Sequence, residues 1–239
     1  MTAEEWGTIA DLATALGTLI LAVATFSSVR SSNVMAKVAQ QQLLVQLRPV
    51  LTTSRREDPV LKVNFGDMKW VRIPGGGAVG EVGAGDGSAG PGGTQVVYLA
   101  IALRNAGNGI AVLHGWRFFP EMHRDEQHAP LEEFQRQNRD LYIPVGDVGF
   151  WQGAFRDPAA TGYEQARAAI EARQPWSVEL LYADHEGGQR AISRFLALPV
   201  EHQFPAHPDD HQGQAGEARP GWLASASRHW SLHRPDGRS

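Results

Sequence analysis

Residues 96–119 read VVYLAIALRNAGNGIAVLHGWRFF, and this stretch carries the strongest fold signal in the chain. Residues 96–103 alternate between a heavier and a lighter apolar face, which is the pattern of a β-strand. Residues 105–109 consist mostly of Asn and Gly, which tolerate a positive φ and favour a turn. A second β-prone run follows at 110–119, so the sequence predicts a β-hairpin here.

A second hairpin is predicted from residues 177–182 and 190–198, which flank a turn at 183–188. Turn signals also separate several shorter strands, and a helix is predicted at 160–172. We therefore expect a mainly-β domain over residues 49–198, an antiparallel β-sandwich with one inserted helix. The shorter strands are predicted at 50–54, 61–65, 68–73, 141–143 and 150–154.

Two segments lack these signals. Ten of the 26 glycines fall in residues 74–94, so a disordered Gly-rich loop is expected there. Residues 199–239 are polar and without periodicity, which predicts a disordered tail. Trp222 and Trp230 lie among arginines in this tail, where they would either contact anionic lipid or a partner groove, or have no role.

A membrane anchor is predicted near the N-terminus. Residues 12–29 read LATALGTLILAVATFSSV without a charge, and as a helix they would span roughly 27 Å of a hydrocarbon core about 30 Å thick. The alternative is a buried helix of a soluble domain, because the Thr and Ser residues make the run only moderately apolar. The preceding MTAEE lacks the basic residues of a signal peptide, so residues 1–30 are expected to form an uncleaved anchor.

The charges around this run predict its orientation. No Lys or Arg precedes it, whereas Arg30, Lys37 and Arg48 follow it closely. The positive-inside rule then places the N-terminus outside and the β domain in the cytoplasm, at the inner or plasma membrane of the cell. The absence of cysteine agrees with a reducing compartment.

Small residues recur on one stripe of the predicted membrane helix. Small side chains allow two membrane helices to approach closely, and Thr hydroxyls can bond across the gap. The stripe is therefore a candidate contact for a homodimer or for another membrane protein, although such residues are also common in membrane helices generally. The candidate packing residues are Ala10, Thr14, Gly17, Thr18 and Ala22.

A helical stalk is expected over residues 31–48, which contain neither Gly nor Pro until Pro49 restricts the residue before it. Met35, Val38, Gln42 and Val45 follow coiled-coil spacing. This pattern covers only two heptads and includes a Gln, so it favours a simple helical stalk over a coiled-coil zipper.

The layout resembles a group of functionally uncharacterised bacterial single-pass membrane proteins. The resemblance is carried by one N-terminal helix, a basic stalk ending in Arg48-Pro49, and a strand followed by Asn-x-Gly-x-Gly-x-Ala. The Asn-x-Gly element is also similar to turns in immunoglobulin-like β-sandwich modules. The resemblance implies an immunoglobulin-like sandwich behind an anchor, and it implies no activity. The motif residues are Asn105, Gly107, Gly109 and Ala111.

Composition and motifs exclude several kinds of chemistry. The net charge of −4 argues against a nucleic-acid partner, and the absence of cysteine excludes thiol nucleophiles and Cys-ligated metals. Residues 85–90 match G-x-G-x-x-G but lie in low-complexity sequence rather than between a strand and a helix. The histidines and acids at 202–211 and 184–186 are interpreted as tail and turn residues. We predict no catalytic residue, metal or cofactor.

The sequence therefore favours a non-enzymatic adaptor that is anchored in the lipid bilayer and presents its β domain to an unknown protein partner. The alternative is a membrane-tethered ligand sensor or hydrolase with a site in the same domain.

Overall fold

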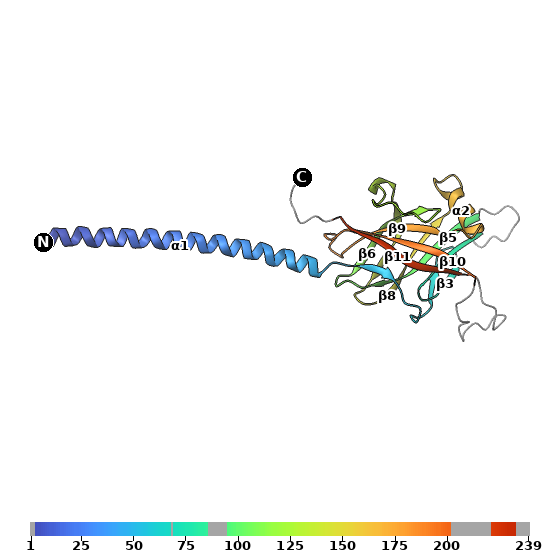
Figure 1. The fold of residues 1–239 in the computed structure, drawn as a ribbon, viewed down its shortest axis with the longest axis horizontal. Coiled ribbons are helices and arrows are strands. Elements are labelled where there is room, and N and C mark those ends of the chain that lie inside the picture. The colour runs from blue at the N-terminus through green and yellow to red at the C-terminus, as the bar shows by residue number, and fades with distance from the viewer. Residues whose placement is uncertain (1–2, 68, 86–94, 202–220, 233–239) are drawn as a thin grey trace. The chain divides into compact units, whose positions relative to one another are not determined.

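The computed structural model of the chain describes residues 3–67, 69–85, 95–201 and 221–232. It divides into two compact units, Met1–Val45 and Gln46–Ser239. Among the described residues, the first unit is helical and the second contains the strands (Figure 1).

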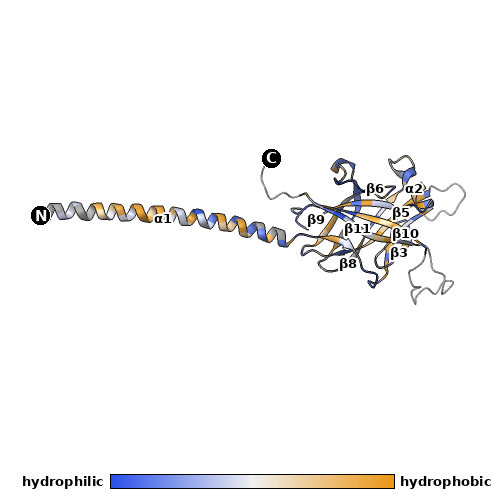
Figure 2. Ribbon diagram, in the orientation of Figure 1, coloured by the Kyte–Doolittle hydropathy of each residue, from blue (hydrophilic) through white to orange (hydrophobic). Residues whose placement is uncertain are grey.

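Helix α1 (Ala3–Gln46) is continuous over 44 residues and covers both the predicted anchor and the predicted stalk. Its segment Trp6–Gln40 is long and apolar enough to cross a membrane, and an 18-residue window within it has a mean hydropathy of 1.9 and no buried share. Figure 2 shows apolar residues recurring along α1, with more hydrophilic residues toward its C-terminal end. The sequence-based expectation of one candidate membrane-spanning helix is confirmed.

The second unit is mainly β, as the sequence predicts. Its strands form one antiparallel nine-stranded sheet in the order β1-β5-β4-β11-β10-β9-β6-β7, with β8 also paired to β5, and a separate ribbon of β2 and β3. The strands are β1 (Leu51–Thr53), β2 (Leu61–Asn64), β3 (Trp70–Ile73), β4 (Gly77–Ala84), β5 (Gln95–Asn105), β6 (Ala111–Phe119), β7 (Gln135–Ile143), β8 (Val148–Phe155), β9 (Trp176–Ala183), β10 (Ala191–Val200) and β11 (Gly221–Ser231).

The large sheet curls on itself. Strand β7 ends the order on one side, and β8 pairs with β5 near the other side. These two strands are nevertheless consecutive in the chain, and the Gln137 side chain of β7 donates to Gln152 O of β8 at 2.8 Å. The main core therefore lies inside one curled sheet rather than between two stacked sheets, and the immunoglobulin-like sandwich is not confirmed. Helix α2 (Tyr163–Glu171) lies within the predicted range 160–172 and packs its Tyr163 and Ile170 into this core.

Strand β5 is buried on both faces, which explains its two apolar faces in the sequence. Val97, Leu99 and Ile101 belong to the main core inside the curled sheet. The lighter face, which includes Tyr98 and Ala100, is covered by the β2–β3 ribbon in a second cluster. This second layer removes the outer face of β5 from water.

One predicted hairpin is confirmed and the other is wrong. Strands β9 and β10 pair antiparallel from Ala191↔Tyr182 to Ala197↔Trp176, as expected. Strand β5 instead pairs with β1, β4 and β8, while β6 pairs with β7 and β9. The turn at 105–109 does not join adjacent strands, because its backbone is used to hold a different segment, as described below.

Two predictions of disorder are wrong for part of their ranges. Within 74–94, residues 77–84 form β4, because glycine there allows close packing: a Cβ at Gly80 would lie 2.4 Å from the Ile170 Cδ1 of α2. Within 199–239, residues 221–231 form β11, which pairs with β10 over most of its length and with β4 at Trp222 and Leu223. Residues 86–94, 202–220 and 233–239 lie outside the described residues.

Candidate functional site

The β domain begins with a segment, residues 47–50, that runs along the turn at 105–109. Two backbone N–H groups of the turn donate to carbonyl groups of the segment, in the manner of a short strand pair. The pairs are Ala106 N with Val50 O at 2.8 Å and Asn108 N with Arg48 O at 3.1 Å.

The two glycines of the turn permit this contact. A Cβ at Gly109 would lie 1.7 Å from Leu47 O, and one at Gly107 would lie 2.4 Å from Arg48 O. Any side chain at either position would collide with backbone, so the spacing Asn-x-Gly-x-Gly is dictated by the incoming chain. We call residues 47–50 and 105–109 the entry clamp.

Asn105 holds the entry clamp together from inside. Its side chain is fully buried and makes four hydrogen bonds, so its amide is completely satisfied. Oδ1 accepts from the N–H groups of both the segment and the turn, and Nδ2 donates to two carbonyls. The partners are Val50 N (3.3 Å), Gly107 N (3.0 Å), Gly109 O (2.6 Å) and Ile143 O (3.0 Å).

A cluster of four side chains lies beside the entry clamp, and we call it the His229 cluster. His229 Nδ1 is 2.9 Å from Ser193 Oγ and 3.2 Å from Tyr182 Oη, and His229 Nε2 is 2.7 Å from the Arg48 guanidinium. Tyr182 Oη in turn accepts from the backbone N–H of Leu51 at 3.1 Å. The cluster therefore connects Arg48 of the entering segment, and Leu51 directly after it, to β9, β10 and β11.

The Ser193–His229 pair has the spacing of a nucleophile and its base, but its protonation is wrong for that role. A guanidinium can only donate, so His229 Nε2 must accept from Arg48. The ring proton then resides on Nδ1, which donates toward Ser193 instead of accepting from it. Ser193 is also buried, with 1% of its surface exposed.

The surroundings of His229 favour its neutral form. Partial burial lowers the pKa of His229 from its ordinary value, and the positive charge of Arg48 lowers it further. Burial also raises the pKa of Tyr182, so its hydroxyl remains protonated. The cluster is a neutral hydrogen-bonded network next to one arginine.

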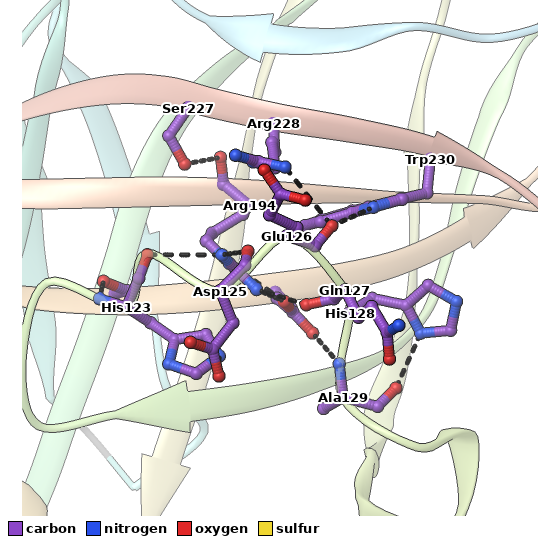
Figure 3. Close-up of polar contacts among 12 residues, drawn as sticks. His123, Asp125, Glu126, Gln127, His128, Ala129, Arg194, Ser227, Arg228 and Trp230 are labelled. Carbon is purple, nitrogen blue, oxygen red and sulfur yellow. Dashed lines mark hydrogen bonds and ion pairs between the residues drawn. The ribbon is translucent and has the colours of Figure 1, made fainter.

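A second cluster lies on the outer face of the sheet, and we call it the Arg194 cluster. Arg194 of β10 stands opposite Glu179 of β9, and both side chains are buried although the neighbouring Val178 and Leu180 point into the core. The segment at 123–129 covers the pair (Figure 3). No local pattern predicts this cluster, because single charged residues in predicted strands are usually exposed.

All five N–H donors of Arg194 are used. Nε and Nη2 donate to Glu179 Oε1 at 2.9 and 2.5 Å, and the other donors reach three backbone carbonyls. Glu179 Oε2 accepts from Ala129 N at 2.9 Å. The carbonyls belong to His123 (3.3 Å), Asp125 (2.7 Å) and Gln127 (2.9 Å).

Strand β11 closes the Arg194 cluster from above. The Trp230 ring lies over the guanidinium at 4.9 Å, and its Nε1 donates to Glu126 O at 3.1 Å. Figure 3 shows Trp230 and Arg228 both directed at the carbonyl of Glu126. Because every donor of Arg194 is occupied, Arg194 cannot bind an anion. Its role is structural, and it holds the 123–129 segment against the sheet.

The residues singled out in the sequence are placed as follows. Asp184 forms the predicted turn, accepting from Gly188 N at 2.7 Å, and Trp222 is buried in the core rather than presented by a tail. No cluster of metal-binding residues occurs within the described ranges. Residues 202–211, and 86–90 of the glycine motif, lie outside those ranges.

The candidate packing residues all lie on α1. The Thr18 hydroxyl donates to Thr14 O at 2.9 Å and Ala15 O at 2.8 Å, so in this structure it is satisfied within its own helix. Gly17 has nothing within 4 Å of an added Cβ. The Ala10 side chain lies outside the described residues, and Ala22 is exposed.

No family model matches the chain, and no curated protein or solved structure shows significant similarity to it. The resemblance to bacterial single-pass membrane proteins is therefore unconfirmed beyond the N-terminal helix and the β-rich domain.

Proposed function

We propose that the chain is a single-pass membrane protein whose β domain recruits a protein partner to the bilayer without catalysing a reaction. One observation carries the proposal: the apolar span of α1 belongs to a helix that ends at Gln46, and the domain's first residues after it are fixed by the entry clamp. Confinement at a membrane raises the effective concentration of any partner that the domain binds.

The state of the polar clusters supports a binding role over a catalytic one. His229 is held in the tautomer that cannot deprotonate Ser193, and every donor of Arg194 is occupied. Neither cluster offers an unused acid, base or nucleophile to a substrate.

We propose that the domain faces the cytoplasm of the cell. Arg30 and Lys37 follow the apolar run within α1, Arg48 lies just beyond the helix, and the segment before the run has no basic residue. The experiment is a pair of fusions, one carrying a reporter active only outside the cytoplasm after Ser54 and one carrying a cytoplasm-dependent reporter at the same site. Activity of the first reporter alone would contradict this orientation.

Recruitment is tested by crosslinking the full chain in its native membrane, followed by detergent pull-down and mass spectrometry. A matched chain keeps the β domain but carries an unrelated membrane helix in place of residues 12–29. The proposal expects the same partner with both chains and none with a chain that ends at Leu47. Recovery of the full chain from the soluble fraction without detergent would overturn the membrane anchor, and partner binding by the chain ending at Leu47 would overturn the role of the domain.

A further inference from the structure

Helix α1 carries one uninterrupted heptad seam that passes through both the apolar span and the stalk. Counting back from Val45 in alternating steps of three and four residues gives Gln42, Val38 and Met35, and the same count continues through Ser31 and Ser28 into the span. The five charged residues of the helix all fall off these positions. The seam positions within the span include Gly7, Ala10, Thr14, Gly17, Leu21 and Ala24.

In the stalk, Met35 and Val38 of the seam are exposed on α1. A 44-residue helix is roughly 66 Å long, whereas the hydrocarbon core is about 30 Å thick, so a large part of α1 lies outside it. Beyond Arg30 the helix still exposes two apolar seam residues, Met35 (69%) and Val38 (46%). Apolar side chains on one face of a helix in water indicate that another surface covers them.

The glycines of α1 point to the same face independently. The helix has two glycines, Gly7 and Gly17, and both fall on the seam. Neither has any atom within 4 Å of an added Cβ, so nothing in the described chain requires glycine there. Glycine weakens a helix, and in membranes it is used where a second helix approaches closely.

We propose that the seam is the contact of a parallel homodimer, in which two copies of α1 pack from the span to the end of the stalk. In such a dimer each seam residue meets its own copy, which is tolerated only where the seam carries no charge. Two copies inserted at the same depth and in the same direction also bring the whole seam into register. Gln42 then meets Gln42 in the stalk, as single polar seam residues do when they fix register. This deepens the proposed function, since it rests on insertion of α1.

The test uses the absence of cysteine in the chain. Single-cysteine variants Met35→Cys and Val38→Cys lie on the seam, and Ala36→Cys and Gln40→Cys lie on the opposite side of the same exposed stalk. Each full chain is oxidised in its native membrane and separated without reductant. If α1 forms this dimer, we expect a strong band of disulfide-linked dimer for the seam variants. The controls should give under about a fifth of that dimer yield, because their Cα atoms in the two copies are too far apart for a disulfide.

Continuity between span and stalk is tested by a second change in the Val38→Cys chain. Gly17→Leu fills the seam in the span, and Ala15→Leu makes the same change off the seam. The proposal expects Gly17→Leu, and not Ala15→Leu, to reduce the Val38→Cys dimer severalfold while membrane insertion persists.

Equal crosslinking at all four stalk positions, no dimer at any of them, or crosslinks to a different protein would each overturn the homodimer. An unchanged yield with Gly17→Leu would overturn the continuous seam. A chain found outside the membrane fraction would instead overturn the proposed anchor, so the two failures are distinguished.

Discussion

Ser193 and Arg194 are neighbours on β10, and they take part in two polar clusters of opposite character. The Arg194 cluster lies on the outer face of the sheet, carries a full ion pair and is closed on every side, with 1% and 0% of the two charged side chains exposed. The His229 cluster lies on the opposite face beside the entry clamp, joins three neutral side chains to the guanidinium of Arg48, and includes the exposed residue His229.

The difference indicates what each cluster does. Removing one partner of a buried ion pair whose donors are all satisfied strongly destabilises the fold. The Arg194 cluster therefore holds the 123–129 segment in place on the sheet. The His229 cluster is reached by solvent and depends on one protonation state, so it holds the entering segment in a way that responds to pH.

The largest expected effect is the loss of one partner of the buried pair. Glu179→Gln leaves the Arg194 guanidinium without its counter-charge, and we expect the free energy of unfolding to fall by about 3 kcal/mol. Urea unfolding of the full chain in detergent measures it. The control is Glu164→Gln, which breaks the exposed pair with Arg167 and should have little effect. Equal effects of the two variants would contradict the role of the Arg194 cluster as a buried ion pair that stabilises the domain.

The next effect concerns the entry clamp. Asn105→Ala removes both donors and both acceptor contacts of a fully buried amide and leaves four backbone groups without this partner. We expect a loss of roughly 2 to 3 kcal/mol in the same unfolding measurement. Asn108→Ala serves as the control, because only the backbone of Asn108 enters the clamp. A clamp that tolerates Asn105→Ala as well as Asn108→Ala is not held as described.

A smaller and more local effect is expected from the turn glycines. Gly109→Ala places a Cβ 1.7 Å from Leu47 O, which forces the entering segment to shift and costs about 1 to 3 kcal/mol. Gly83→Ala in β4 meets only ordinary contacts at 3.5 Å and should be tolerated. Hydrogen exchange of Ala106 and Asn108 N–H reports the shift directly, and unchanged protection in Gly109→Ala would argue against it.

The smallest expected effect is the pH response of the His229 cluster. The pKa of His229 in the folded state lies below 6.5. As the pH falls through 6.5, His229 is therefore protonated in the unfolded state while it is still neutral in the folded state. Stability contributed by neutral His229 is therefore complete above pH 6.5 and is lost between that pH and the folded pKa. His229→Gln should flatten this part of the unfolding curve against pH. Burial also lowers the pKa of His114, so His114 makes a separate contribution to the pH dependence of stability. His114→Gln is therefore the control, and it should leave the part due to His229 unchanged.

The elements that the sequence predicts well are those with local patterns. The alternation at 96–103, the 177–198 hairpin and the long helix before Pro49 all depend on residues close together in the chain, and the structure has each of them. The partners of those elements were not predictable in the same way. The 105–109 turn has the composition of a hairpin, yet its glycines are there because residues 47–50 lie against them.

The clusters escaped prediction for a related reason. Arg194 and Glu179 are brought together by the β9–β10 register, but their burial depends on a segment that lies fifty or more residues before Glu179, and no local pattern predicts that contact. Strand β11 was not predicted because only Trp222 and Ala224 show the alternation of buried residues that marks a strand. The residues that follow them in β11 are mostly polar. The Asn105–Gly109 motif was found, and only its role in holding the chain entry required the structure.

The position of β11 has a consequence for how the domain forms. It fills the place between β4 and β10, and its contact with β4 joins Ala78 to Trp222, residues far apart in the chain. Until that strand arrives, β4 and β10 present unpaired edges that can capture other strands. Such distant pairings form late, because a long chain loop must close first. Folding of the domain is thus expected to end with β11, and the interval before its arrival is when misassociation is the main hazard.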